Sequence, residues 1–129
     1  MVVAILFFAR VLRVAKVQAR PADYEKRSRR RHRRPLALEF IEPLQRSGER
    51  VEVNGGLIIG RSRECDLSVQ DTYLSSRHAR VETDDGDLSI EDLGSTNGTY
   101  VNQELVKGRV YLERGDVVQV GGVLFEVVR

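Results

Sequence analysis

The sequence predicts an all-β, antiparallel sandwich over residues 36–129, and three observations favour this fold class. From Leu36 onward, apolar and polar residues alternate with a period of two in short runs that are rich in Val, Ile and Leu. Turn-forming residues separate these runs at close spacing. No stretch of the region has the apolar spacing of three and four residues that is typical of an amphipathic helix. The binding residues of such a sandwich usually lie in loops at one end.

Residues 1–17 are expected to form a short apolar or amphipathic helix that anchors the chain to a membrane. Met1–Ala9 is an unbroken apolar run. Four cations follow at intervals of three or four residues and therefore share one helical face: Arg10, Arg13, Lys16 and Arg20. A helix the length of the apolar run rises only about 14 Å, whereas the core of a bilayer is about 30 Å thick.

The order of apolar and charged residues leaves three interpretations of this first segment. The cations follow the apolar run, whereas in a secretory signal they precede it. Cations in this position mark the cytoplasmic side of a membrane. The segment is therefore the end of a transmembrane helix that begins upstream of Met1, an amphipathic anchor on an anionic leaflet, or a frayed helix without a function.

Residues 18–35 are expected to form a disordered basic linker, because they combine dense positive charge with almost no apolar content. Residues 10–34 hold eleven Lys or Arg and two acidic residues, a net charge of 11 − 2 = +9. Residues 35–129 hold ten basic and seventeen acidic residues, a net charge of 10 − 17 = −7. Beside an apolar anchor, the stretch RSRRRHRR favours acidic lipid head groups, and nucleic acid is the less expected partner because the stretch has no aromatic residue for base stacking.

The strands of the expected sandwich are ten short runs between turn signals. The runs are LALEFIE, RVEVN, LIIGR, DLSV, HARVETD, DLSIED, TYVN, RVYL, DVVQV and VLFEVV. The turn signals are Asn54-Gly55-Gly56, Asp84-Asp85-Gly86, Asn97-Gly98 and Gly121-Gly122. Cys65 is the only cysteine, so the chain has no internal disulfide, and we interpret it as a small packing residue.

Four loop segments contain residue types that are poor strand formers and therefore need another explanation. They are Gly60-Arg61, residues 74–78 (LSSRH), residues 94–99 (GSTNGT) and Val101-Asn102. Together they supply guanidinium groups, hydroxyl groups and the N–H groups of tight turns, a set that suits an oxyanion ligand. The sequence has no carboxylate pair, no phosphate-binding Walker loop and no Cys/His metal spacing. We therefore expect a binding module without a cofactor or a metal, and not an enzyme.

The pattern GR-x13-S-x2-H followed by STNGTYVN resembles the signature of the forkhead-associated (FHA) family. The resemblance covers roughly residues 36–129, and the family's five hallmark positions are matched by Gly60, Arg61, Ser75, His78 and Asn97. It implies a β-sandwich of about eleven strands whose loops at one end bind phosphothreonine in an extended peptide.

The resemblance also implies a role for each matched residue. Phosphate would be bound by Arg61, Ser75, Ser76 and Thr96; the peptide would contact Asn97, Tyr73 and Arg77; Gly60, His78 and Asn102 would be structural. Ser76 stands where the family often has Arg or Asn, so we expect a weaker phosphate contact there. Gln103 stands where many members have Gly after Asn, which makes the turn at Asn102-Gln103 a departure from the pattern.

These expectations combine into a signalling adaptor. We expect an FHA domain in the cytoplasm, held at the inner face of a membrane, that docks proteins phosphorylated on threonine by a Ser/Thr kinase. This layout resembles short bacterial membrane-anchored proteins with a single FHA domain. The alternative is a nucleic-acid-associated adaptor in which the basic linker binds nucleic acid and the FHA domain recruits a partner.

Overall fold

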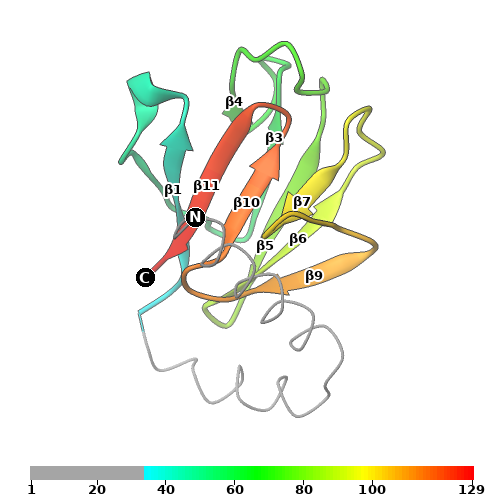
Figure 1. Cartoon of the computed structure of the whole chain (residues 1–129). Coiled ribbons are helices and arrows are strands. Elements are labelled where there is room, and N and C mark those ends of the chain that lie inside the picture. Colours follow the sequence, from blue (N-terminus) through cyan, green and yellow to red (C-terminus); the bar gives the residue numbers. More distant parts are fainter. Residues whose placement is uncertain (1–33) are drawn as a thin grey trace, which may run out of the picture.

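The computed structural model describes residues 34–129, which form two packed β-sheets (Figure 1). The expected helix over residues 1–17 and the linker up to residue 33 lie outside the described residues. The six-stranded sheet has the order β2-β1-β11-β10-β7-β8, and the five-stranded sheet has the order β4-β3-β5-β6-β9. Eleven strands in two sheets confirm the predicted all-β class.

The strands follow the predicted runs closely. The six-stranded sheet contains β1 (Ala37–Glu42), β2 (Arg50–Val51), β7 (Thr99–Val101), β8 (Glu104–Leu105), β10 (Val117–Val120) and β11 (Val123–Val128). The five-stranded sheet contains β3 (Gly56–Gly60), β4 (Leu67–Ser68), β5 (Ala79–Asp84), β6 (Asp87–Asp92) and β9 (Arg109–Leu112). The sequence analysis missed β8 and a single turn of 3-10 helix, η2 (Leu44–Arg46), because neither is long enough to show a period.

The prediction of a purely antiparallel sandwich is wrong at one strand pair. Strand β4 runs parallel to β3, with Ile59 opposite Leu67 and Gly60 opposite Ser68. The connection 61–66 turns back along β3, where the backbone N–H of Ile58 donates to an Asp66 carboxylate oxygen at 2.8 Å. Strand β4 therefore lies beside the last two residues of β3 and runs in the same direction.

The core lies between the two sheets, and it is built by the alternation of side chains along each strand. Leu38 and Phe40 on β1 and Phe125 on β11 are at most 1% exposed. Phe40 lies opposite Phe125, with ring centroids 4.6 Å apart. Burying one such ring stabilises the fold by roughly 1.5–3 kcal/mol.

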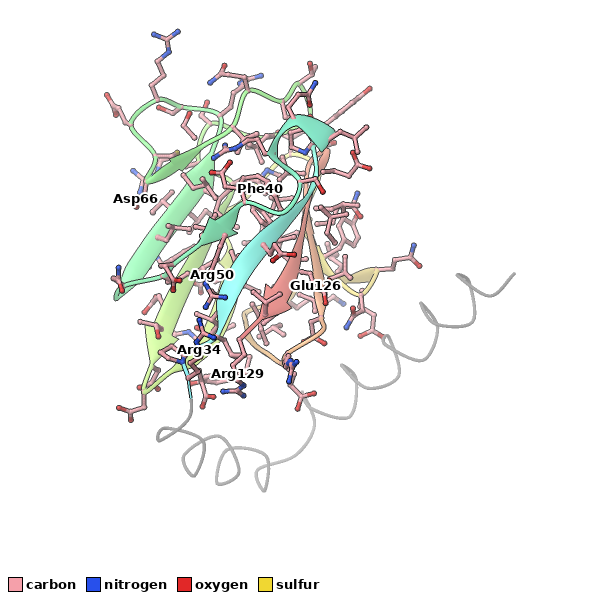
Figure 2. The ribbon with its side chains drawn as sticks, turned by 90° about the vertical axis from the view of Figure 1, so that its left-hand side faces the viewer. Arg34, Phe40, Arg50, Asp66, Glu126 and Arg129 are labelled. Atoms are coloured by element: carbon pink, nitrogen blue, oxygen red, sulfur yellow. The ribbon has the colours of Figure 1, made fainter. Side chains whose placement is uncertain are left out.

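The described chain begins at the end of the sandwich opposite to the loops that follow β3, β4 and β6 (Figure 1). The N–H of Leu36 donates to the carbonyl of Gly86, in the tight turn between β5 and β6, at 3.1 Å. The side chain of Arg129, at the C-terminus, donates to the carbonyl of Arg34 at 2.7 Å (Figure 2). Both ends of the described chain therefore lie at the same end of the molecule. Over residues 34–129, no helix has the length and apolar content needed to cross a membrane.

Candidate functional site

Gly60 brings the end of β3 into contact with the loop of residues 74–78. A Cβ atom at this position would overlap the carbonyl of Ser76 and would lie 2.7 Å from the Cys65 sulfur. The close approach allows two backbone hydrogen bonds. The Arg61 N–H donates to the Ser75 carbonyl at 2.9 Å, and the Ser62 N–H donates to the Ser76 carbonyl at 3.1 Å. Only glycine fits here, and it places Arg61 beside Ser75.

Hydrogen bonds hold the backbone of Arg61, whereas its side chain has no partner among residues 34–129. Its carbonyl accepts hydrogen bonds from the side chains of Ser68 at 3.4 Å and Gln70 at 3.1 Å. The guanidinium is exposed and makes no hydrogen bond or ion pair with any residue from 34 to 129. A guanidinium held on a rigid backbone and left without a partner is suited to an anionic ligand.

Ser75 connects the loop of residues 74–78 to the loop of residues 94–98. Its Oγ accepts a hydrogen bond from the backbone N–H of Thr96 at 3.0 Å. The hydroxyl hydrogen of Ser75 is left to donate, and Thr96 itself is exposed. The structure thus brings three of the four predicted phosphate ligands together, and exposed Ser76 follows Ser75 directly in the same loop.

His78 lies under these two loops and is fully buried. Its Nδ1 accepts a hydrogen bond from the Ser75 N–H at 3.0 Å, and its Nε2 lies 2.8 Å from the carbonyl oxygen of Gly98. Since Nδ1 must carry a lone pair to accept, the ring proton is on Nε2 and donates to Gly98. The neutral imidazole therefore links both loops.

Asn97 and Tyr73 form a second part of the site. The Asn97 side-chain amide donates to the backbone carbonyl of Tyr73 at 2.8 Å, and the Tyr73 ring is 65% exposed. Both residues line a cavity of about 360 Å³, together with Gly98, Tyr100 and Gln119. Arg77 lies elsewhere: it lines a separate cavity of about 270 Å³ with Cys65 and the acidic residues of the 61–66 connection.

Asp92, which the sequence analysis missed, holds the 94–98 loop in place. Its carboxylate accepts hydrogen bonds from the N–H groups of Gly94 and Ser95 at 3.0 and 2.9 Å, and from the hydroxyls of Ser95 and Thr99 at 2.6 and 2.7 Å. Partial burial acts to raise the pKa of Asp92, but these hydrogen bonds outweigh it and the pKa is lowered. An Asp at a strand end, with Gly and Ser two and three residues later, is a turn signal that could have identified it.

Asp71 and the turn at Gly121-Gly122 support the Tyr73 side of the site. The Asp71 carboxylate accepts hydrogen bonds from the N–H groups of Tyr73 at 3.1 Å and Gly122 at 2.9 Å. Gly121 has φ +59°, and a Cβ there would lie 2.8 Å from the Leu74 nitrogen. The turn between β10 and β11 therefore packs directly against the residues around Tyr73.

Asn102 lies away from these loops and within the fold. It is fully buried, its side-chain amide donates to Asp116 at 3.1 Å, and its side-chain oxygen accepts from the N–H of Val117 at 2.9 Å. These bonds attach the turn between β7 and β8 to the start of β10. Over residues 34–129, no group of three His, Cys, Asp or Glu side chains could hold a metal ion.

Sequence comparison supports the resemblance inferred from the loops. Residues 57–121 match the family model of the FHA domain. The FHA domain-containing protein FhaB of Mycolicibacterium smegmatis is 37% identical over 82 residues, which are 63% of this chain and 53% of that protein. The oxoglutarate dehydrogenase inhibitor of Corynebacterium diphtheriae is 45% identical over 62 residues, which are 48% of this chain and 43% of that protein. The chain spans about half the length of these curated relatives.

Solved structures agree with this result. An FHA domain from a structural and functional study of phosphothreonine-dependent FHA interactions is 32% identical, with a TM-score of 0.65 over 73% of this chain and 95% of that chain. The FHA domain of FhaA, solved in complex with the intracellular domain of Rv3910, is 32% identical, with a TM-score of 0.64 over 71% of this chain and 98% of that chain. The family resemblance inferred from the sequence is confirmed.

Proposed function

The chain belongs to the FHA family, whose members are interaction modules that bind phosphothreonine peptides, and we propose that it docks proteins phosphorylated on threonine by a Ser/Thr kinase. The phosphate would lie between Arg61, Ser75 and Thr96. One observation carries this proposal: the Arg61 guanidinium has no partner among residues 34–129, while the Arg61 backbone is bonded to Ser75, whose Oγ accepts from the Thr96 N–H of the second loop. A phosphate dianion supplies acceptors for the Arg61 guanidinium and for the hydroxyl hydrogen of Ser75.

The peptide backbone would run past Asn97 and Tyr73. The cavity beside Asn97 is lined by uncharged groups, including two tyrosine rings and glycine backbone, which supports contact with an extended peptide. Ser76 would add a weaker phosphate contact, because a neutral hydroxyl is a weaker partner than a guanidinium.

The cellular setting is part of the same proposal. Residues 1–17 would bind the cytoplasmic face of a membrane, and residues 18–35 would adhere to its acidic head groups. The described chain begins at the end of the sandwich opposite to the site loops, and this supports the arrangement. A domain tethered through Leu36 would present its site away from the bilayer. The site would then be open to cytoplasmic phosphoproteins.

Arg61→Ala tests the phosphate site. Because the side chain makes no hydrogen bond or ion pair with residues 34–129, its removal should leave the fold intact and cost about 2–5 kcal/mol of phosphopeptide binding, roughly 30-fold to several-thousand-fold in Kd. Calorimetry with a phosphothreonine peptide measures the change. Arg114→Ala is the matched control, since Arg114 is also exposed but lies in the turn between β9 and β10, at the other end. Equal affinity of the two variants would remove Arg61 from the site.

Peptides that differ only in the phosphorylated residue test the choice of threonine. We expect a recess for the γ-methyl beside the Asn97 loop, which would contribute on the order of 1 kcal/mol in addition to the stiffer χ1 of threonine. Phosphothreonine should therefore bind about tenfold more tightly than phosphoserine. Phosphotyrosine should fail, because its ring holds the phosphate too far from the backbone beside Asn97. Equal binding of phosphoserine and phosphothreonine would refute the methyl recess and leave the phosphate contacts standing.

A further inference from the structure

The outer face of the six-stranded sheet carries apolar side chains around two carboxylates. Alternation along three neighbouring strands of this sheet points the following half-buried residues away from the core: Glu39 and Ile41 on β1, Leu124, Glu126 and Val128 on β11, and Val117 and Gln119 on β10. The only helix among residues 34–129 is the single turn η2, so no described helix covers this face. An apolar sheet face of this kind marks an interaction surface.

The two carboxylates stand directly opposite each other on neighbouring strands. Glu39 pairs in register with Glu126, an arrangement in which like charges repel. Arg50 lies opposite Glu39 on the other side of β1 (Figure 2), but its guanidinium binds the Glu52 carboxylate at 2.5 Å and the Arg129 carbonyl at 3.1 Å. No cation from residues 34–129 pairs with either glutamate.

The outer face of the five-stranded sheet is different. There Glu82 on β5 lies 3.9 Å from the Arg80 guanidinium and 3.5 Å from that of Arg109 on β9. The acid on that face is compensated by cations of the same face, as expected of a surface that meets only water. The face around Glu39 and Glu126 lacks such compensation and therefore favours a cationic, apolar partner.

We propose that this partner is the N-terminal segment of the same chain, residues 1–20. The segment has the complementary composition, with aliphatic residues interleaved with four cations that recur at helical spacing. It is also within reach, because residues 21–33 extend to about 40 Å at full length, whereas a six-residue strand such as β1 is about 20 Å long. The linker joins the domain at the start of β1, which belongs to this face.

This contact makes the domain and an acidic membrane competitors for one segment. In the absence of lipid, the aliphatic side chains of residues 1–20 cover Ile41 and Leu124 while their cations meet Glu39 and Glu126. Acidic lipid head groups attract the same cations and release the segment from the sheet. The phosphopeptide loops lie elsewhere, so the contact does not depend on phosphothreonine binding.

A tryptophan placed in the segment reports the contact in the chain of residues 1–129, which has no other tryptophan. In lipid-free buffer, Val14→Trp should emit at a shorter wavelength than tryptophan in water, equally at every protein concentration. High salt should weaken the shift. Adding Glu126→Lys should abolish it, whereas Glu64→Lys, the same charge reversal at an exposed position of the 61–66 connection, should leave it unchanged.

A charge exchange completes the test. Arg13→Glu should abolish the shift, and Arg13→Glu combined with Glu126→Lys should restore it, because the attraction is then reversed but present. Water-like emission of the Val14→Trp chain, an equal response to Glu126→Lys and Glu64→Lys, or a shift that appears only with phosphatidylserine vesicles would overturn the proposal. A shift that grows with protein concentration would assign the contact to a second copy and also overturn it.

Discussion

At the scale of single residues, His78 links the two loops that carry the candidate phosphate ligands. Its Nδ1 accepts a hydrogen bond from Ser75 N–H, its Nε2 donates one to the Gly98 carbonyl, and it has no exposed surface. His78→Ala would leave both backbone groups unpaired in a buried site. We expect it to lower the free energy of unfolding by about 2–4 kcal/mol and also to weaken phosphopeptide binding.

Urea denaturation and calorimetry on the same variant separate bracing from ligand contact. A bracing role predicts that stability and affinity fall together. If His78→Ala unfolded like the natural chain and yet failed to bind, the imidazole would have to contact the peptide directly, which its burial under the loops argues against.

Asp92 makes the stability of the 94–98 loop depend on pH. Its pKa is lowered in the folded chain because hydrogen bonds from Ser95, Thr99 and Gly94 stabilise the carboxylate more than burial destabilises it. A lowered folded pKa contributes stability above the ordinary Asp value of about 4, and this contribution is lost as the pH falls through the folded pKa. Asp92→Asn should therefore flatten the acid limb of the stability curve.

The measurement is the urea midpoint of the natural chain, Asp92→Asn and Asp84→Asn as a function of pH below neutrality. Asp84→Asn is the control, because it removes an exposed carboxylate from β5. Asp84 lies at the end of the β5–β6 pair that is far from Asp92. Parallel curves for Asp92→Asn and the natural chain would show that the carboxylate does not hold the loop in its charged form.

At the scale of elements, the turn between β7 and β8 contains Gln103, a residue whose side chain is unfavourable at the backbone conformation of the turn. Val101 pairs with Glu104, so Asn102 and Gln103 are the two central residues of a hairpin turn, with φ +49° and +70°. Such a turn favours Asn-Gly, because a side chain crowds the backbone at positive φ. Gln103→Gly should therefore raise the free energy of unfolding by about 0.5–1 kcal/mol.

The neighbouring position gives the matched comparison. Asn102 also has a positive φ, but its side chain bonds to Val117 and Asp116, so Asn102→Gly should destabilise the chain. Thermal unfolding of both variants measures the difference. A loss of stability in Gln103→Gly would mean that the Gln103 side chain contributes more than its backbone strain costs.

The sequence predicts strands whose side chains alternate, and it misses features that depend on tertiary pairing. The run VLFEVV corresponds to β11 without change, because one of its faces is buried along its whole length. The parallel direction of β4 has no local signal, since it depends on the contact between Asp66 and Ile58. The Asn97-Gly98 pair is a typical hairpin signal. In the structure it lies instead in the loop that connects β6 to β7, two strands of different sheets.

The candidate site shows the same limit. Arg61, Ser75 and Asn97 could be located because their residue types stand out in loops at one end of a sandwich. Asp92 and Asp71 were missed because an acidic residue at a strand end is common, and only the folded loops reveal how many donors it accepts. The position of Arg77 beside a different cavity could not be predicted either, because adjacent loop residues can point in opposite directions.

At the scale of the whole molecule, the end of the sandwich that holds the site loops is opposite to the end where the chain enters. The net charge divides along the sequence: it is +9 over residues 10–34 and −7 over residues 35–129. An acidic domain on a basic tether is repelled by an acidic bilayer while its linker is attracted to it. We therefore expect the domain to stand off the surface with its loops accessible.

This arrangement predicts that membrane binding and phosphopeptide binding are independent. The chain of residues 1–129 on phosphatidylserine vesicles should bind a phosphothreonine peptide with the same affinity as in solution. Changing Arg29, Arg30 and Arg31 to Gln should weaken vesicle binding by about 3 kcal/mol, roughly a hundredfold, because each cation near the surface contributes about 1 kcal/mol. The matched control replaces three exposed cations of the domain with Gln, namely Arg63, Lys107 and Arg114.

Vesicle flotation and peptide titration in the same samples distinguish the arrangements that the charge division allows. If the linker is the membrane contact, only the linker triple variant leaves the vesicles, and peptide affinity stays equal in all three chains. Equal loss from vesicles in both triple variants would mean that the domain itself lies on the lipid, since its own cations would then share the contact. Weaker peptide binding on vesicles would mean that the site faces the bilayer. That result would contradict the expectation from the opposed positions of Leu36 and the site loops. Salt-dependent binding of the linker to duplex DNA, with no flotation of any chain, would assign the basic segment to nucleic acid instead.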